Sequence, residues 1–368
     1  MTKPSSLLGR VATLVLSNLG LVALLLIPIE LVFGNWVRPF GLSDLRRFSI
    51  PSGVTYTFDP TLLYPADTHV ATYSRDEHGL RGATRSLSDI DVVTVGGSTT
   101  DQRYLDDAMT WQAVSERELA MMGQSLAFTN AGVDGQSTVG HEFNFRNWFP
   151  LLKELRPQIV LFYVGTNDVL RVQHREDYDR SVDVSTWRAK SALFQVYRAL
   201  LGNLRARQTG VTHGRSIPRP EEFTDQGLLT DSERDELADA LTATFLAQVD
   251  DLRKHVEAWG AKPVFVTQTA FGWNADHNPP RGRRNELRIY GLMTNFADVA
   301  FLHQQLNRGL MAHCAVRRIV CFDLAADVTF VDVDYYDPLH NSPAGAEKIG
   351  RYLAQRLSRL STKSRATH

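Results

Sequence analysis

The sequence predicts an α/β fold with an open, parallel, five-stranded sheet that is covered by helices on both faces. Three observations predict it. Short apolar runs alternate with longer helical segments from residue 91 onward. The runs are continuously apolar, which is typical of strands buried on both faces by crossover helices. Small and polar residues follow four of the five runs, and functional sites of such sheets lie at these strand ends.

The chain begins with an apolar segment from Val11 to Phe33, interrupted by Ser17, Asn18, Pro28 and Glu30. As a helix it would be about 34 Å long, which is enough to cross a hydrocarbon core of about 30 Å. A cleaved signal peptide is the alternative, but no A-x-A-like cleavage site follows Leu26. We therefore expect residues 1–36 to be an uncleaved transmembrane helix, with the lipid bilayer as a partner.

The orientation of this helix is predicted from its short N-terminal tail, because the positive charges on its two sides are nearly balanced. We expect a single-pass protein of the cytoplasmic membrane, with the rest of the chain on the outer side. Cys314 is expected to end a helix and Cys321 to lie in the next strand. A disulfide between them would fit an oxidising compartment, and two reduced, buried thiols are the alternative.

Residues 37–90 are predicted to form an irregular leader that packs on the main domain, because prolines are scattered through them. The polar segment Tyr73–Gly82 is expected on the surface, with His78 and Arg81 in a salt-bridged turn. The main domain is expected to comprise residues 91–368. Insertions at about 171–229 and 271–294 follow strand ends, where such segments usually form lids or substrate walls.

Within the main domain the strands and helices are predicted from apolar patterning and capping signals. Thr230 and Glu233 form a capping box before the clearest helix, and Gly260 ends it. Ser342 and Pro343 are a cap and a first helical residue. The expected strands are Asp91–Val95, Leu126–Asn130, Ile159–Val164, Val264–Gln268 and Ile319–Phe322. The expected helices are Thr110–Met122, Glu142–Leu155, Asp231–Trp259, a stretch around Asn295–Ala312, and one from Pro343 to about Leu360.

Two motifs far apart in the sequence predict a serine nucleophile and its base. Gly96-Gly97-Ser98 directly follows the first strand, and Asp337-Pro338-Leu339-His340 lies near the C-terminus. A serine hydroxyl needs an adjacent base, and a histidine base needs a carboxylate that holds its tautomer. A Gly-Gly-Ser turn by itself is more often a tight bend. Because the motifs occur together at strand ends, we expect Ser98 to be the nucleophile, His340 the base and Asp337 the orienting carboxylate.

With Gly135 after the second strand and Asn167 after the third, these blocks resemble the SGNH, or GDSL-like, hydrolase superfamily over about Asp91 to Leu360. The resemblance implies a flavodoxin-like three-layer α/β/α sandwich. It also implies an oxyanion hole made by the N–H groups of Ser98 and Gly135 and the Asn167 amide. One residue departs from the pattern: Gly97 stands where the first block usually has Asp. We expect this change to alter local packing or substrate preference rather than to abolish the chemistry.

The resemblance implies a serine esterase that hydrolyses O-acyl esters through an acyl-Ser98 intermediate. Gly-Gly-Ser-Thr forms are similar to those of membrane-tethered bacterial relatives, which suggests O-acetyl groups on cell-envelope glycans as the substrate. An O-acyltransferase using the same site, or a non-catalytic scaffold that binds glycan, are the alternatives. The net charge of −1 gives no case for nucleic acid as a partner. No metal-ligand spacing is present, so we expect neither a metal nor a cofactor.

Overall fold

The computed structural model describes residues 7–48, 50–65, 69–82, 84–170, 184–209, 215–274 and 278–365. The chain divides into two compact units. The smaller unit comprises Met1–Arg47 and Val182–Thr212, and the larger comprises Phe48–Ser181 and His213–His368. Parts of both predicted insertions, including residues 171–183, 210–214 and 275–277, lie outside the described residues.

The larger unit is built on a parallel sheet with the strand order β12-β7-β5-β3-β4. In chain order the strands therefore lie 5-4-3-1-2, which is the flavodoxin-like arrangement. All four ladders between neighbouring strands are parallel. The sheet confirms the predicted fold and its five strands. The strands are β3 (Val92–Gly96), β4 (Phe128–Asn130), β5 (Ile159–Tyr163), β7 (Lys262–Val266) and β12 (Val320–Phe322).

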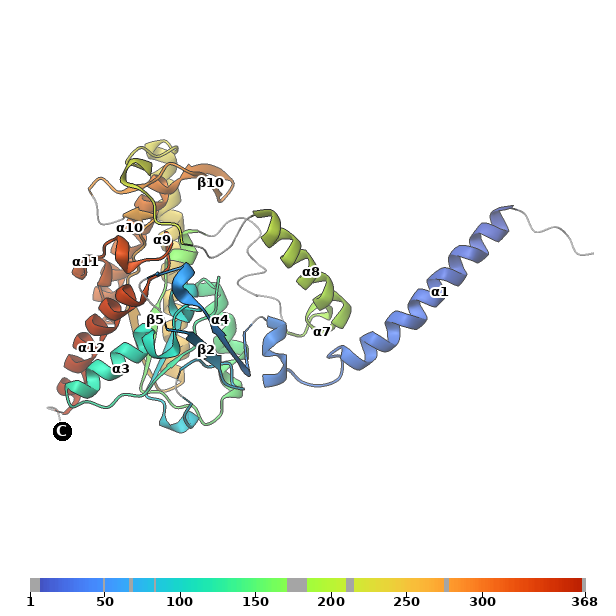
Figure 1. The fold of residues 1–368 in the computed structure, drawn as a ribbon, viewed down its shortest axis with the longest axis horizontal. Helices are drawn as coiled ribbons and strands as arrows, with labels where there is room; N and C mark the ends of the chain where they lie inside the picture. The colour runs from blue at the N-terminus through green and yellow to red at the C-terminus, as the bar shows by residue number, and fades with distance from the viewer. Residues whose placement is uncertain are drawn as a thin grey trace, which may run out of the picture. The chain divides into compact units, whose positions relative to one another are not determined.

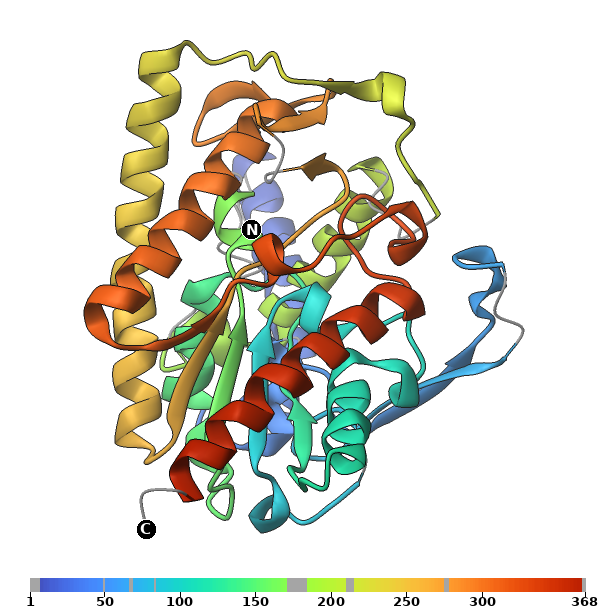
Figure 2. The ribbon, with the colours of Figure 1, turned by 90° about the vertical axis from the view of Figure 1, so that its left-hand side faces the viewer.

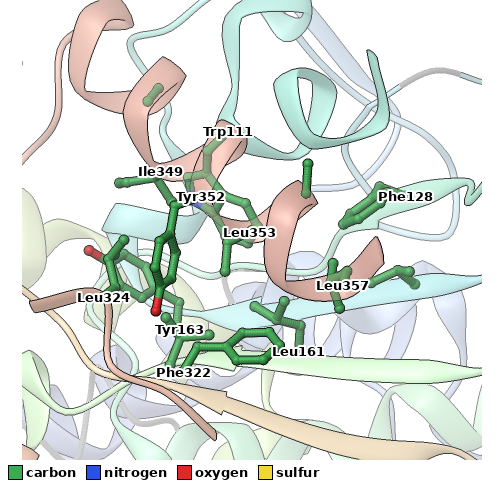
Figure 3. Close-up of a cluster of buried hydrophobic side chains, with 14 of the residues drawn as sticks. Trp111, Phe128, Leu161, Tyr163, Phe322, Leu324, Ile349, Tyr352, Leu353 and Leu357 are labelled. Atoms are coloured by element: carbon green, nitrogen blue, oxygen red, sulfur yellow. The ribbon is translucent and has the colours of Figure 1, made fainter. Parts of the chain in front are cut away.

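One face of the sheet is covered by α3 (Trp111–Met121) and α12 (Pro343–Arg365), which lie side by side in front of the strands in Figure 2. Alternate residues of a strand point to opposite faces, so Leu161 and Tyr163 of β5 both point toward these helices. Figure 3 shows the resulting cluster, in which helix side chains such as Trp111 and Leu353 pack over strand side chains such as Leu161. This apolar layer holds the helices against the sheet.

The opposite face is covered by α4 (Thr138–Asn147) and α9 (Asp231–Ala258), and α10 (Phe296–Arg317) packs against α9. Phe162 of β5 lies 6.0 Å from Phe145 of α4 and 4.7 Å from Phe265 of β7, measured between ring centroids. The helix expected at 142–155 begins earlier, after Ser137, and ends at Asn147. It ends there because Pro150 follows in a separate 3₁₀ turn.

The predicted leader contains a regular antiparallel pair, β1 (Val54–Phe58) and β2 (Ala71–Arg75). The expectation that its polar segment lies on the surface is wrong for Tyr73, Arg75 and Arg81, which are 1%, 2% and 1% exposed. Buried guanidinium groups are tolerated when charged and hydrogen-bonding partners surround them, and Asp101 is such a partner here. The leader therefore contributes to the interior of the larger unit.

Shorter elements complete the larger unit. The strands β6 (Phe223–Thr224), β8 (Trp273–Asn274) and β9 (Arg281–Arg283) form one small sheet, and β10 (Glu286–Ile289) pairs with β11 (Leu292–Asn295). The short helices are α2 (Ser98–Asp101), α5 (Thr166–Val169) and α11 (Leu324–Asp327). The 3₁₀ turns are η2 (Pro60–Leu62), η3 (Leu87–Asp89), η4 (Asp107–Met109), η5 (Phe149–Leu151), η6 (Pro220–Glu222) and η7 (Asp332–Asp334).

A disulfide joins Cys314 of α10 to Cys321 of β12, with their Cα atoms 6.2 Å apart. From the sequence, a disulfide and two reduced thiols were both possible for this pair. Cys314 lies one turn before the end of its helix and Cys321 lies in the middle of its strand, as their positions in the sequence indicated.

The smaller unit contains α1 (Leu7–Phe33), η1 (Leu42–Phe48, whose last residue belongs to the larger unit), α7 (Trp187–Lys190) and α8 (Ala192–Thr209). Residues Thr13–Phe33 of α1 are long and apolar enough to cross a membrane, and a signal sequence would have the same properties. Glu30, near the end of α1, accepts hydrogen bonds from the backbone N–H groups of Ala192 and Leu193 at 3.1 and 3.0 Å. The carboxylate thus caps the N-terminus of α8.

Candidate active site

Ser98 is the first residue of α2, which begins directly after β3 at the carboxyl edge of the sheet. The turn is closed by the N–H groups of Thr100 and Asp101, which donate to the Gly97 carbonyl at 3.0 and 2.9 Å. The helix ends after one turn because Gln102 adopts a left-handed conformation with a φ of 49°. A sharp turn at a strand end presents the serine hydroxyl at the rim of the sheet.

The loop that carries Asp337 and His340 brings both residues to this hydroxyl. His340 Nε2 lies 2.7 Å from Ser98 Oγ, and His340 Nδ1 lies 2.7 Å from Asp337 Oδ2. The other carboxylate oxygen, Asp337 Oδ1, accepts from the N–H groups of Leu339 and His340 at 2.8 and 2.7 Å. The structure thus brings together the serine, histidine and aspartate that the sequence singled out.

The charge state of the imidazole is set by two opposing effects. Burial lowers the pKa of His340, but the hydrogen bond and negative charge of Asp337 raise it more, so the pKa lies above its ordinary value of 6.5. The Tyr336 ring stacks on the imidazole with a centroid distance of 5.7 Å and fixes its plane. A histidine held in this way is oriented by its neighbours before any substrate arrives.

Three hydrogen-bond donors lie near the serine turn. Asn167 is held by its side-chain Nδ2, which donates to the Gln136 carbonyl at 2.8 Å and keeps a second N–H. Gly135 has a φ of 76°, a conformation that favours glycine. Within the described part of the chain, the backbone N–H groups of Ser98 and Gly135 donate to no acceptor. This set is the kind of donor arrangement that stabilises a developing oxyanion.

Gly97 packs directly against the Asn167 amide. A Cβ atom at position 97 would overlap Asn167 Nδ2 and would also lie 3.1 Å from the Gln136 carbonyl oxygen. Position 97 therefore has no room for a side chain while the amide keeps this place. Because Gly97 has no side chain, the Asn167 amide can lie directly against the serine turn. The expected effect of Gly97 on local packing or substrate preference stays a prediction.

A buried ionic network, which the sequence analysis missed, holds α2 from behind. Asp101 Oδ1 accepts from Arg75 Nη2 at 2.7 Å and from the Tyr73 hydroxyl at 2.9 Å. Burial raises the pKa of Asp101, but the guanidinium groups of Arg75, Arg103 and Arg81 lower it more, so the carboxyl stays charged. The sequence signal was weak, because nothing in a polar leader indicates that its arginines are buried.

Arg81 completes this support through backbone carbonyls. Its guanidinium donates to the carbonyls of Asp101, Gln102 and Leu105, the last two at 2.7 and 2.6 Å. It also pairs with Asp107 at 2.8 Å. Carbonyls at the end of a one-turn helix lack intrahelical partners, and a guanidinium with five donors can satisfy several of them at once. The leader thus fixes the far end of the helix that begins with Ser98.

Gln268, two residues after β7, connects three of the strand ends and was not predicted from the sequence either. Its Nε2 donates to Thr99 Oγ1 at 2.9 Å and to the Tyr163 carbonyl at 3.0 Å. Its Oε1 accepts from the Thr166 N–H at 2.6 Å. A polar residue that ends an apolar strand was the available signal for this role. Asp168 caps α4 by accepting from the Thr138 N–H at 3.1 Å.

A hollow of about 320 Å³ lies beside the histidine loop. Phe271 contacts Tyr335 with a centroid distance of 5.6 Å, and Phe330 contacts Tyr335 at 5.8 Å. The next residue after Phe271, Gly272, donates its N–H to the Pro338 carbonyl at 2.5 Å, so one wall of the hollow is bonded to the loop between Asp337 and His340. Thr269 and Arg281 add polar groups to its lining.

Among the described residues, no group of three or more His, Cys, Asp or Glu side chains is arranged to hold a metal ion. Residues 94–263 match the model of the GDSL-like Lipase/Acylhydrolase family. No curated protein matches the sequence.

Several solved structures are similar to this chain. Est24, a carbohydrate acetylesterase from Sinorhizobium meliloti, is 13% identical over 74% of this chain and 99% of its own, with a TM-score of 0.39. The aryl esterase of M. smegmatis is 12% identical over 74% of this chain and 99% of its own, with a TM-score of 0.41. A catalytic mutant of Axe2, an acetylxylan esterase from Geobacillus stearothermophilus, is 12% identical over 72% and 93%, with a TM-score of 0.40.

Proposed function

We propose that this chain, whose residues 94–263 match the model of the GDSL-like Lipase/Acylhydrolase family, is a serine esterase in which Ser98 carries the acyl group. The observation that carries the proposal is the pair of 2.7 Å contacts from Ser98 Oγ to His340 and from His340 to Asp337. Nucleophile, base and orienting carboxylate in hydrogen-bond reach of one another form the geometry that activates a serine hydroxyl.

In the proposed reaction, His340 Nε2 takes the proton of Ser98 Oγ as this oxygen attacks the acyl carbon. His340 then gives the proton to the departing alcohol, which leaves an acyl-serine ester. Water attacks this ester with His340 again as the base, which releases the acid and restores the serine. Asp337 holds the proton on Nδ1, so that Nε2 stays free to accept. The N–H groups of Ser98 and Gly135 and the Asn167 amide stabilise the oxyanion.

Replacement of the serine tests the proposal directly. Ser98→Ala should lower kcat for an activated acetyl ester by about 10⁶, as loss of a serine nucleophile does where the rest of the site remains. The same variant should lose labelling by a fluorophosphonate probe. Ser115→Ala is a matched control, because the Ser115 hydroxyl is buried in α3 and bonds the Trp111 carbonyl at 2.8 Å. Wild-type protein of confirmed fold that takes no label would favour a non-catalytic scaffold.

Removal of the amide donor tests the oxyanion role separately. Asn167→Ala should lower kcat by about 10²–10³ and leave KM nearly unchanged, because the donor acts mainly on the transition state. Steady-state kinetics with a small acetyl ester measure both constants. A rise in KM alone would contradict this role.

For the substrate we propose O-acetyl groups on a glycan. The aromatic-lined hollow beside the histidine loop supports this choice, since sugar rings pack their C–H faces on aromatic rings and hydroxyl groups find polar partners in such pockets. Phe271→Ala should raise KM for an acetylated oligosaccharide and leave KM for a small aryl acetate unchanged. Equal changes in KM for the two substrates would show that the hollow does not bind the glycan.

An O-acyltransferase remains the second candidate, since a sugar hydroxyl can replace water in the second half of the reaction. Burst kinetics with an activated acetyl ester, with and without a glycan acceptor, separate the two activities. An esterase releases free acetate at the same rate in both cases. A transferase releases little free acetate with or without the acceptor, and it turns over only when the acceptor is present, because the acetyl group then passes to the glycan hydroxyl.

We also propose that α1 anchors the chain in the cytoplasmic membrane, with the larger unit on the outer side. The length and apolar character of Thr13–Phe33 support this proposal. In cells, the full chain should stay in the membrane pellet after alkaline carbonate extraction. Protease added to spheroplasts should digest the larger unit. Release of the chain by carbonate would indicate a cleaved signal sequence or a peripheral protein.

A further inference from the structure

The α8 helix in the smaller unit carries a stripe of apolar side chains that is largely exposed. Leu193, Val196, Tyr197 and Leu200 follow the i, i+3, i+4, i+7 spacing of a single helix face. Val196, Tyr197 and Leu200 are 59%, 57% and 60% exposed within the structure. A surface helix of a soluble domain ordinarily turns such a face inward. This reversal indicates that another apolar surface covers the helix.

The opposite face of α8 makes the contacts within the smaller unit. Arg198 Nη2 donates to the Arg47 carbonyl at 2.7 Å, and Phe194 lies 5.3 Å from Trp187 of α7 between ring centroids. On a helix, positions 194 and 198 lie away from the stripe that contains 196, 197 and 200. The helix therefore cannot turn its apolar face inward without breaking these contacts.

The N-terminus of α8 is bonded to the end of the proposed membrane span. Besides the two backbone bonds that Glu30 accepts from α8, the carboxylate accepts from Trp36 Nε1 at 3.0 Å. The Asn35 N–H, just beyond the span, donates to the Lys190 carbonyl at 2.8 Å. In Figure 1, α8 leaves this end of α1 crosswise to it rather than alongside it. If α1 crosses a bilayer, α8 begins at the level where the chain leaves the hydrocarbon.

The residues around this junction are those that membrane interfaces favour. Trp187 and Trp36 are 58% and 41% exposed, and tryptophan prefers the headgroup level of a bilayer. Arg188 and Lys190 supply positive charge just before the start of α8. A helix with an apolar face, flanking basic residues and interfacial aromatics lies in the plane of a membrane surface and favours anionic lipids.

We propose that α7 and α8 form a second membrane contact, an interfacial helix that lies in the headgroup region of an anionic bilayer with Val196, Tyr197 and Leu200 toward the acyl chains. The proposal rests on the anchoring role proposed for α1, since Glu30 fixes α8 to that helix. It does not depend on the esterase activity.

The test uses the full chain in vesicles of phosphatidylcholine and phosphatidylglycerol that contain a lipid with a nitroxide on a shallow acyl carbon. Cysteine is introduced by Val196→Cys, by Leu200→Cys, or by Gln195→Cys as the matched control on another face, and is labelled with an environment-sensitive fluorophore. The two native cysteines form a disulfide and do not react without reductant. We expect blue-shifted emission and strong nitroxide quenching at 196 and 200, with neither at 195.

Two outcomes would overturn the proposal. If aqueous iodide quenches the labels at 196 and 200 as strongly as the label at 195, the apolar face of α8 lies in water. If the labels at 196 and 200 are blue-shifted but neither iodide nor nitroxide lipid quenches them, the apolar face of α8 is covered by protein. Carbonate extraction of the same vesicles reports on α1 separately, because a chain that is extracted has lost its span whatever the fluorophores report.

Discussion

The serine turn and the histidine loop meet at one hydrogen bond, but they are held in different ways. The turn that begins with Ser98 is fixed by side chains from a distant segment, chiefly Arg75 and Arg81 of the leader. The loop from Asp337 to His340 is fixed mainly by its own residues, with one bond from outside, from the Gly272 N–H to the Pro338 carbonyl. Asp337 caps the N–H groups of Leu339 and His340, and the Tyr336 N–H donates to the His340 carbonyl at 3.1 Å.

This difference separates local from non-local support. A loop of four residues that caps its own N–H groups carries much of its geometry in its sequence, because the aspartate bonds backbone groups two and three residues ahead. A one-turn helix cannot satisfy its own end, so its geometry depends on whatever packs behind it. Damage to the histidine loop should therefore affect the chemistry, and damage behind the serine turn should affect folding first.

Among changes to the residues that support the nucleophile and the base, the largest effect is expected on the histidine side. Asp337→Asn keeps an oxygen that can cap the loop, so the fold should survive. Its amide cannot hold the proton on Nδ1 in the same way, and kcat should fall by about 10⁴. Kinetics with an activated acetyl ester and a thermal melt measure the two quantities. A melting temperature that falls together with the rate would mean that the loop is not self-supporting.

The next effect is expected behind the serine turn. Arg75→Met leaves the Asp101 carboxylate buried without its closest cation, and loss of one partner of a buried pair costs about 3–5 kcal/mol in the free energy of unfolding. Urea denaturation measures this free energy. The matched control is Arg253→Met on α9, whose pair with Glu257 is partly exposed and should contribute less than about 1 kcal/mol. Equal losses in the two variants would refute a special role for the network.

A smaller effect is expected where the serine turn meets the oxyanion donors. Gly97→Ala places a Cβ where Asn167 Nδ2 now lies, so the amide must move. If the amide is an oxyanion donor, kcat should fall by about 10²–10³ while the unfolding free energy changes little. In the Asn167→Ala background the same substitution should cost much less. Full additivity of the two changes would show that they act independently.

The smallest effect concerns pH. Because the pKa of His340 is raised above 6.5 and the base must be neutral, kcat/KM should rise with pH through a midpoint above 6.5. Protonated His340 also stabilises the folded state. That stability is fully present below 6.5 and is lost as pH rises through the folded-state pKa. As pH rises, kcat/KM should therefore increase while the contribution of His340 to the free energy of unfolding decreases. A kinetic midpoint below 6.5 would contradict the pairing with Asp337.

The sequence was sufficient to predict the five strands and the five residues of the candidate site, because both signals are local. Continuous apolar runs mark buried strands. Ser98, Gly135 and Asn167 each lie in a short motif after a strand, and Asp337 and His340 share one motif in the loop before α12. Arg75, Arg81 and Gln268 were not predicted, because their roles depend on partners 20 or more residues away in sequence. Helix ends were missed where a cap or a proline outweighed the apolar pattern, as at Ser137 and Pro150.

The disulfide between α10 and β12 has a consequence for handling the protein. β12 is a three-residue strand at one end of the sheet order, held by hydrogen bonds to a single neighbour. The disulfide closes a loop between residues separated by 7 positions in sequence. By restricting the unfolded chain, it adds about 2.5 kcal/mol to the free energy of unfolding. Produced under reducing conditions, the molecule would lose this tether, and a frayed edge strand is a template for intermolecular pairing. Redox conditions during expression should therefore govern how much of the product stays free of aggregates.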